Sequence, residues 1–200
     1  MMTIYLVPVG RTGLSPNGEL LGINNPPLSV AGKAHADEAA EILRSIVLEA
    51  VFSGPLKREV ETAERIAAPH SMPVRTDRDI RDINYGSWCG RTWSNIEKNE
   101  ALMFAKFRQS PKKFKFPVGE KVKKGGKRIQ SFASSTLANY GTGNVAVIAD
   151  DIILYLLASQ MAKVELSGIE PWKSSLGAIS TLECDDGKCV IKTLRGISLK

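Results

Sequence analysis

The chain has 200 residues, of which 43% are hydrophobic and 24% charged, a composition typical of a folded domain with a sizeable core. No apolar run approaches the roughly 18 residues that a membrane-spanning helix needs. No secretory signal pattern precedes the first strand-like run, so we expect a soluble cytoplasmic protein without a membrane span.

Short apolar runs and helical patterns alternate along the chain. Apolar runs predict buried strands at 3–9, 50–53 and 144–149, and a brief edge strand at 74–75. Apolar residues at helical spacing predict helices at 29–46, 56–68, 127–140 and 152–161, with a weaker helical pattern at 93–107. Ser29 suits the N-cap of the first helix, and Pro69 stops the second.

A hairpin is predicted near the C-terminus, where strand-like runs at 178–184 and 189–194 flank the turn sequence Asp185-Asp186-Gly187-Lys188. The overall alternation predicts an α/β fold, a three-layer α/β/α sandwich whose mostly parallel sheet ends in this C-terminal hairpin. No internal repeat or linker is visible, so we expect a single domain over residues 1–200.

The three cysteines do not suggest a disulfide framework, because their number is small and odd. Cys184 and Cys189 stand on either side of the predicted turn and could face each other across it. Two alternatives stay open for this pair, a disulfide or two reduced thiols. No further ligands for a zinc site are visible nearby.

Several motifs occur in a fixed order. They are Pro27-Leu28-Ser29 with Gly32, Pro55-Leu56-Lys57-Arg58 with Thr62-Ala63, the spaced Gly86, Trp88 and Gly90, and the late strand at 144–149. With these motifs the chain resembles the histidine phosphatase superfamily, the phosphoglycerate-mutase-like fold, along nearly its whole length. The resemblance implies phosphoryl chemistry at the ends of two strands, no cofactor, and the option of a homodimer, since family members are often dimers.

The first catalytic motif of that family is altered here. The resemblance places an arginine and the nucleophilic histidine after the first strand, and Pro8 and Val9 stand at those positions. Gly10 and Thr12 match the family pattern, but Arg11 replaces the acid between them. Valine offers no lone pair for attack on phosphorus, and Pro8 lacks a backbone N–H. We therefore do not expect catalysis through a phosphohistidine.

The second half of the implied pocket is altered in a matching way. Arg58 keeps the family's second arginine, and Asp82 stands where a glutamate proton donor is usual. Asp150 replaces the second histidine, and Asp151 replaces the glycine after it. If the two strand ends meet, Asp150 brings a negative charge into the former phosphate site. We hypothesise an internal ion pair from Asp150 to Arg58 or Arg11, with Val9 packed beneath.

Residual chemistry has two other sources in the sequence. A carboxylate can act as a nucleophile, which makes Asp150 a candidate, and Asp150 and Asp151 with Asp82 could hold a metal ion such as Mg²⁺. The structural alternative is that Asp150 and Asp151 only cap the following helix and stabilise its N-terminus. The two histidines, His35 and His70, are not at strand ends and read as surface or cap residues.

Positive charge is concentrated in one segment, residues 106–128, which holds ten basic residues and one acid, Glu120. Within it, the candidate contacts for an anionic ligand or acidic partner are Lys112, Lys113, Lys115, Lys121, Lys123 and Lys124. Phe104, Phe107, Phe114 and Phe116 interleave with the basic residues, a pattern that can bind and stack nucleic acid. It can also meet an anionic membrane surface, or remain a solvated loop anchored by its phenylalanines.

In the family this region is a variable cap over the active site, which we place at about 101–126. Lys121, Lys123 and Lys124 follow Gly119-Glu120, where the family has Gly-Glu-Ser near the pocket, so some of this charge is expected to reach the cleft. Our leading hypothesis is a non-catalytic binding or regulatory protein of this fold. The alternatives are a phosphoesterase with altered, Asp- or metal-assisted chemistry, and a nucleic-acid or acidic-partner binder acting through residues 106–128.

Overall fold

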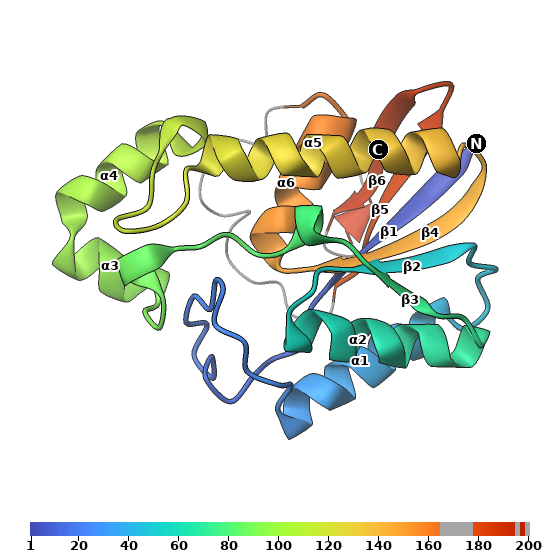
Figure 1. The fold of residues 1–200 in the computed structure, drawn as a ribbon, viewed down its shortest axis with the longest axis horizontal. Helices are drawn as coiled ribbons and strands as arrows, with labels where there is room; N and C mark the ends of the chain where they lie inside the picture. Colours follow the sequence, from blue (N-terminus) through green and yellow to red (C-terminus); the bar gives the residue numbers. More distant parts are fainter. Residues whose placement is uncertain (165–177, 195–196, 199–200) are drawn as a thin grey trace.

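A mixed β-sheet crosses the part of the chain that the computed structural model describes, residues 1–164, 178–194 and 197–198 (Figure 1). From edge to edge its strands are β3 (Val74–Thr76), β2 (Ala50–Ser53), β4 (Gly143–Ala149), β1 (Met2–Pro8), β5 (Ser180–Asp185), β6 (Lys188–Leu194) and β7 (Ile197–Ser198). The first four are parallel to one another, and the last three add antiparallel pairs. The predicted parallel sheet and its C-terminal hairpin are both confirmed.

Helices cover both faces of this sheet, which confirms the three-layer arrangement. Helices α1 (Val30–Leu43) and α2 (Lys57–Ala67) lie on one face, and α5 (Val122–Asn139) and α6 (Asp151–Met161) lie on the other (Figure 1). Side chains alternate between the two cores, so that Leu6 faces one and its neighbour Val7 the other. Strand β4 is fully buried from Val145 to Ala149, as expected for a central parallel strand.

The start of α1 packs tightly against the end of β1. Ser29 caps the helix as predicted, because its hydroxyl accepts a hydrogen bond of 3.0 Å from the Gly32 backbone N–H. A Cβ on Gly32 would lie 2.0 Å from the Arg11 carbonyl oxygen, and one on Gly10 would lie 2.3 Å from the Gly32 carbonyl oxygen. These two glycines therefore allow the chain after β1 to cross the helix start at van der Waals distance.

The part of the chain between α2 and α5 differs from expectation in two places. The predicted helix at 93–107 is two helices, α3 (Trp93–Asn99) and α4 (Ala101–Gln109), separated at Glu100. The helix expected from residue 127 begins earlier, because α5 starts at residue 122, within the segment expected as a cap at about 101–126. Gly125 and Gly126 lie inside this helix, where Gly125 is buried beside Ile83 and Gln160 Nε2 donates to the Gly126 carbonyl at 2.9 Å.

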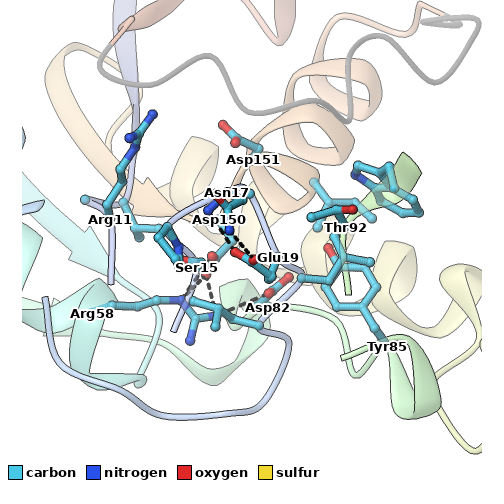
Figure 2. A pocket seen from close by; sticks show the side chains of 18 of the residues that line it. Arg11, Ser15, Asn17, Glu19, Arg58, Asp82, Tyr85, Thr92, Asp150 and Asp151 are labelled. Atoms are coloured by element: carbon cyan, nitrogen blue, oxygen red, sulfur yellow. Dashed lines mark hydrogen bonds and ion pairs between the residues drawn. The ribbon is translucent and has the colours of Figure 1, made fainter. Parts of the chain in front are cut away.

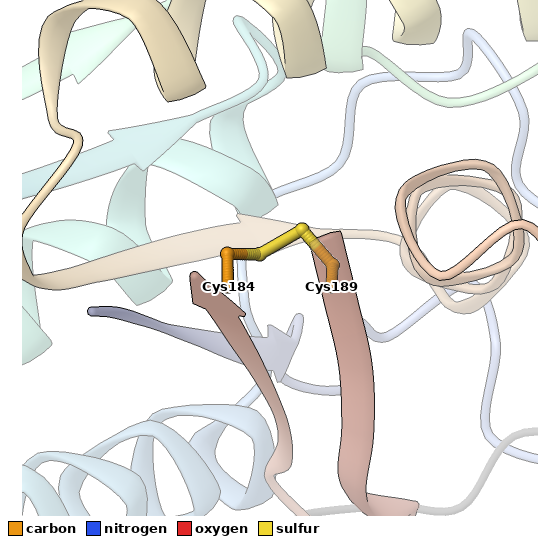
Figure 3. Close-up of a disulfide and its surroundings, with 2 residues drawn as sticks. All are labelled: Cys184 and Cys189. Atoms are coloured by element: carbon orange, nitrogen blue, oxygen red, sulfur yellow. A yellow bond between two sulfur atoms is a disulfide. The ribbon is translucent and has the colours of Figure 1, made fainter. Parts of the chain in front are cut away.

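Cys184 and Cys189 occupy directly opposite positions in the β5–β6 hairpin and form a disulfide (Figure 3). Their Cα atoms are 4.0 Å apart, and both side chains are buried in the larger core. Of the two alternatives left open by the sequence, the structure contains the oxidised pair. Cys89 is a free, partly buried thiol.

Among the described residues, no helix has the length and apolar character needed to cross a bilayer.

Candidate functional site

The ends of β1 and β4 lie side by side at the carboxyl edge of the sheet. Pro8 pairs with Ala149 in the parallel register, and the Val9 N–H donates to the Ala149 carbonyl at 3.3 Å. The residues that follow the two strands, Val9 and Asp150, therefore meet at one place. This is the edge at which α/β proteins of this kind usually bind their ligands.

Arg58 reaches the same edge from the first turn of α2, which begins shortly after β2 ends. Its guanidinium meets the Asp150 carboxylate at three distances of 2.9–3.1 Å, from Nε to both oxygens and from Nη2 to Oδ2 (Figure 2). The Arg58 side chain is completely buried and that of Asp150 is 16% exposed. The expected internal ion pair is present, and it is formed with Arg58 rather than Arg11.

The other donors of the Arg58 guanidinium are also engaged. Nη1 donates to the Asn24 carbonyl at 2.7 Å, and Nη2 donates to the Gly22 carbonyl at 2.9 Å and to Asp82 Oδ2 at 3.2 Å. Every nitrogen of the guanidinium thus has an acceptor from the chain itself. The arginine that the fold offers to an anion is already satisfied without one.

Two more buried carboxylates surround this ion pair. Asp82 Oδ1 accepts from the Ile83 N–H at 2.7 Å, and Glu59 accepts from the backbone N–H groups of Leu56 at 2.8 Å and Asp82 at 3.2 Å. Burial, followed by the nearby charge of Asp150, raises the pKa of Asp82 to about 8 and that of Glu59 to about 9. The Arg58 guanidinium therefore contacts two of the three carboxyl groups, those of Asp150 and Asp82, and Glu59 is held by backbone N–H groups.

Arg58 and Arg128 hold this cluster from two sides. Although burial disfavours its charge, the carboxylates of Asp150 and Asp82 raise the pKa of Arg58. Arg128, on α5, donates to the Asp79 carbonyl at 2.6 Å and to the Asp82 carbonyl at 3.3 Å, and pairs with Glu120 at 3.4 Å. Sequence reasoning counted Arg128 in the basic segment, but its contacts are part of the site's framework.

The remaining strand-end residues have structural contacts of their own. The Gly10 N–H donates to Thr62 Oγ1 at 3.1 Å, and the buried Thr12 hydroxyl lies 3.0 Å from that of Ser15. Figure 2 shows the Arg11 side chain pointing away from Asp150, and Asp151 on the far side of Asp150 from Arg58. Asp151 is the first residue of α6, where an acid favours the helix dipole.

The metal site that the sequence offered as an alternative has no support among the described residues. Among residues 1–164 and 178–194, no group of histidine, cysteine, aspartate or glutamate side chains is arranged to hold a metal ion. The physical reason is that both oxygens of Asp150 face Arg58, while Asp82 accepts from Arg58 and from the backbone of Ile83. These contacts favour the alternative in which Asp150, Asp151 and Asp82 hold no magnesium ion.

A cavity of about 510 Å³ opens at this edge of the sheet. Its lining includes Val9, Gly10, Arg11, Arg58, Asp82, Asp150 and Asp151, together with the segment 15–21, Tyr85, the segment 92–94 and Ile152. Sequence reasoning missed Glu19 and Tyr85 in this lining and Glu59 behind it. Of these, only Glu59 carried a signal, since it follows Arg58 in the helix start. Neither His35 nor His70 lines the cavity.

The basic segment lies apart from this cavity. Lys112, Lys113, Lys115, Lys121, Lys123 and Lys124 are exposed, and none of them lines it. The structure therefore gives no contact between these lysines and the cavity, while Glu120 in the same segment is buried against Arg128 and Arg81.

The phenylalanines of the segment are also unavailable for base stacking. Phe104, Phe107, Phe114 and Phe116 are all less than 8% exposed and pack with Trp88 and Trp93 in one aromatic cluster. Trp88 lies tilted against Phe114 with ring centroids 5.3 Å apart, and Trp93 stacks on Phe107 at the same separation. This corrects the interpretation of an interleaved lysine and aromatic surface for nucleic acid.

The fold, a mostly parallel sheet covered by helices on both faces with a cavity at its carboxyl edge, is that of a three-layer α/β protein. The sequence profile of the histidine phosphatase superfamily (branch 1) matches residues 4–196, so the chain belongs to this family. Among curated relatives, Phosphoserine phosphatase 1 of Hydrogenobacter thermophilus is 24% identical over 97% of this chain and 92% of its own. A probable phosphoglycerate mutase, GpmB of Proteus mirabilis, is 27% identical over 69% of this chain and 64% of its own.

Solved structures show the same fold. A putative alpha-ribazole-5′-P phosphatase from Escherichia coli superposes with a TM-score of 0.82 at 18% identity, covering 100% of this chain and 99% of that one. The mycobacterial glucosyl-3-phosphoglycerate phosphatase superposes with a TM-score of 0.84 at 18% identity, covering 96% of this chain and 98% of that one. At these identities the likeness establishes the fold alone.

Proposed function

We propose that this chain is a non-catalytic member of the histidine phosphatase superfamily that acts as a binding or regulatory protein. The observation that carries the proposal is the Arg58–Asp150 ion pair at the adjoining strand ends, where the family resemblance places the phosphoryl group. In this proposal the Asp150 carboxylate stands in for a phosphate that the cleft no longer takes.

The residues after β1 support the proposal on chemical grounds. Attack on phosphorus through the enzyme needs a side chain with an available lone pair, and Val9 has none. Phosphoryl transfer also needs donors and positive charge around the transferred group. Pro8 contributes neither, and Arg11 points away from Asp150 (Figure 2).

The charge balance of the cleft adds a second support. A phosphate beside Asp150 would place like charges about 4 Å apart, which costs about 4 kcal/mol per pair of unit charges at an effective dielectric near 20. Arg58 cannot offset this fully, because Asp150 and Asp82 already share it. A phosphate would therefore have to displace Asp150 to bind.

Turnover measurements test the proposal directly. We expect p-nitrophenyl phosphate and a panel of phosphate monoesters to be hydrolysed no faster than in a blank, with or without Mg²⁺. The matched variants are Asp150→Ala, in the cleft, and Asp186→Asn, at an exposed turn. Clear turnover that Asp186→Asn keeps and Asp150→Ala loses would overturn the proposal.

Hydrolysis of a phosphate ester is the second candidate function, and the names of the phosphatase relatives favour it. It would require Asp150 to leave Arg58 and act as the nucleophile.

Binding of an acidic partner through the exposed lysines of residues 106–128 is a third candidate, favoured by their solvent exposure. A salt-dependent complex lost on neutralising those lysines would support it.

A further inference from the structure

Exposed lysines of the basic segment gather around the start of α5. Lys115 and Lys121 are partners in an antiparallel β-bridge, so their side chains begin from facing backbone positions. Lys121 is also the N-cap residue of α5, and Lys123 and Lys124 follow it in the first turn. Figure 1 shows this part of the chain toward the end of the molecule that α3 and α4 form. The positive charge is therefore concentrated on one accessible area.

The spacing of these lysines costs stability. Lys123, Lys124 and Lys127 are exposed, on the side of α5 opposite its buried residues. Lys123 and Lys124 precede Lys127 by four and three residues, the spacings at which side chains on a helix are neighbours and like charges are destabilising. Lys115 and Lys121 face each other across their bridge, where like charges are also destabilising.

No acid relieves this repulsion within the part of the chain that the structure describes. Glu120 is the only acid between residues 106 and 128, and it is buried against Arg128 and Arg81. No ion pair between described residues includes Lys115, Lys121 or a lysine of the first two turns of α5. A surface that keeps unpaired like charges together at a cost is complementary to an anionic partner.

An exposed apolar side chain stands among these lysines. Val118 lies in the turn between Lys115 and Lys121 and is 91% exposed. The Gly119 N–H donates to the Phe116 carbonyl at 2.9 Å and closes this turn. The φ of Val118 is 55°, a left-handed conformation that is unfavourable for a β-branched residue. Packing within the chain does not account for a valine here, because almost all of it is open to solvent.

The chemistry of this area fits an anionic membrane better than a soluble polyanion. The phenylalanines of the segment are buried, so they offer no stacking to nucleotide bases. A valine that is 91% exposed stands on a convex surface, which provides no groove for a peptide. An anionic bilayer presents charged headgroups to the lysines and an apolar phase just beneath them for Val118.

We propose that Lys115, Lys121, Lys123, Lys124 and Lys127, with Val118 among them, bind the surface of a membrane that contains anionic phospholipids. The lysines lie at the level of the headgroups, and Val118 enters the outer boundary of the acyl chains. The binding is peripheral and reversible, because one valine buries little apolar area and the remaining attraction is electrostatic. It does not involve the cleft, so it is independent of the proposed function.

Co-sedimentation of the full chain with sucrose-loaded vesicles tests the proposal. One set of vesicles contains phosphatidylcholine alone, and the other contains phosphatidylcholine with about 30% phosphatidylserine. We expect partition onto the anionic vesicles to be at least about ten-fold stronger, and to fall as the salt concentration is raised several-fold above about 0.1 M. No binding to the anionic vesicles, or equal binding to both sets, overturns the proposal.

Two double variants with the same net charge locate the surface. Lys123→Gln with Lys124→Gln removes two charges from it and should weaken partition at least about ten-fold. Lys33→Gln with Lys57→Gln removes two exposed charges from α1 and α2 and should weaken partition by no more than about two-fold. Equal losses in the two variants overturn the proposal, because net charge alone would then be responsible.

Val118→Gly separates membrane binding from simple attraction to a polyanion. It should weaken partition about three- to five-fold, because the apolar contact is lost. Its Tm should stay the same or rise, because glycine accepts a positive φ without cost. Val47→Gly, at a position that is 81% exposed between α1 and β2, is the control and should leave partition unchanged. Unchanged partition of Val118→Gly overturns the proposal.

Soluble polyanions distinguish the other classes of partner. Poly-L-glutamate represents an acidic protein, and a DNA duplex represents nucleic acid. Binding of either one without binding to the anionic vesicles overturns the proposal and supports that class instead. Asp150→Ala, in the cleft, should bind the vesicles as the unmodified chain does. Loss of vesicle binding therefore contradicts the membrane surface alone, whereas phosphatase turnover that depends on Asp150 contradicts the proposed function alone.

Discussion

The buried cluster of Arg58, Asp150, Asp82 and Glu59 and the basic segment at 106–128 differ in where their charged groups lie. In the cluster one guanidinium is buried and has an acceptor at every nitrogen. In the segment the six lysines are exposed, and the apolar side chains between them form the core. From this comparison we expect the cluster to contribute much more to the stability of the fold than the exposed lysines do.

The largest expected effect comes from removing the buried cation. Arg58→Met should lower the free energy of unfolding by about 3–5 kcal/mol, because it leaves the Asp150 carboxylate without its counter-charge and removes the hydrogen bond that Asp82 accepts. The measurement is urea unfolding followed by circular dichroism. Arg65→Met, on the same helix but in an exposed pair with Asp37, is the control and should cost less than about 1 kcal/mol. Equal losses would contradict the comparison.

The Cys184–Cys189 disulfide allows the stability contributed by a covalent bond to be compared with that contributed by the ionic contacts. The unreduced, denatured chain should show one free thiol, that of Cys89, and the reduced chain three. Reduction should lower the free energy of unfolding by about 2 kcal/mol, because the closed loop is short. Since disulfides are rare in the cytosol, thiol counting on protein trapped in cells also tests the cytoplasmic expectation.

The pH dependence of stability should come from the cluster. The pKa of Asp82 is raised to about 8 in the folded chain, against about 4 when unfolded, so the folded state holds its proton more tightly. This stabilisation is complete below about pH 4, declines as the pH rises, and is lost above about pH 8. Glu59 acts in the same direction, with a pKa of about 9.

Thermal melts between pH 6 and pH 9 check this. We expect the Tm to fall by a few °C over the interval, and Asp82→Asn to flatten the fall because that side chain no longer titrates. Asp186→Asn, at the exposed turn, should follow the unmodified chain. A Tm that does not fall with pH in this interval would contradict the raised pKa values of Asp82 and Glu59 in the folded chain.

The smallest effect on stability is expected in the basic segment. Replacing Lys112, Lys113, Lys115, Lys121, Lys123 and Lys124 by Gln should change the free energy of unfolding by no more than about 0.5 kcal/mol per position. The same variant should elute from heparin at lower salt, because it has lost positive surface charge. Lys33→Gln with Lys57→Gln, on α1 and α2, is the control for a change in net charge alone.

The sequence predicted the fold and the central contact of the site better than their surroundings. Asp150 and Arg58 could be placed together because parallel strands and the helix after β2 present their ends at one edge. The buried Glu59, the cavity contact of Tyr85 and the structural contacts of Arg128 depend on packing between α2, α5 and the loop at 79–93. Such contacts leave no local pattern, which is also why the start of α5 through Gly125-Gly126 was missed.

The Asp150 contact also separates folding from the supply of ligand. A protein whose native state alone binds phosphate gains stability as the phosphate concentration rises, by RT ln(1 + [L]/Kd). Here Asp150, a residue of the same chain, supplies the negative charge that pairs with Arg58. This contact therefore does not depend on the concentration of phosphate in the cell. On this basis the scaffold would keep the same stability in phosphate-starved and phosphate-rich cells.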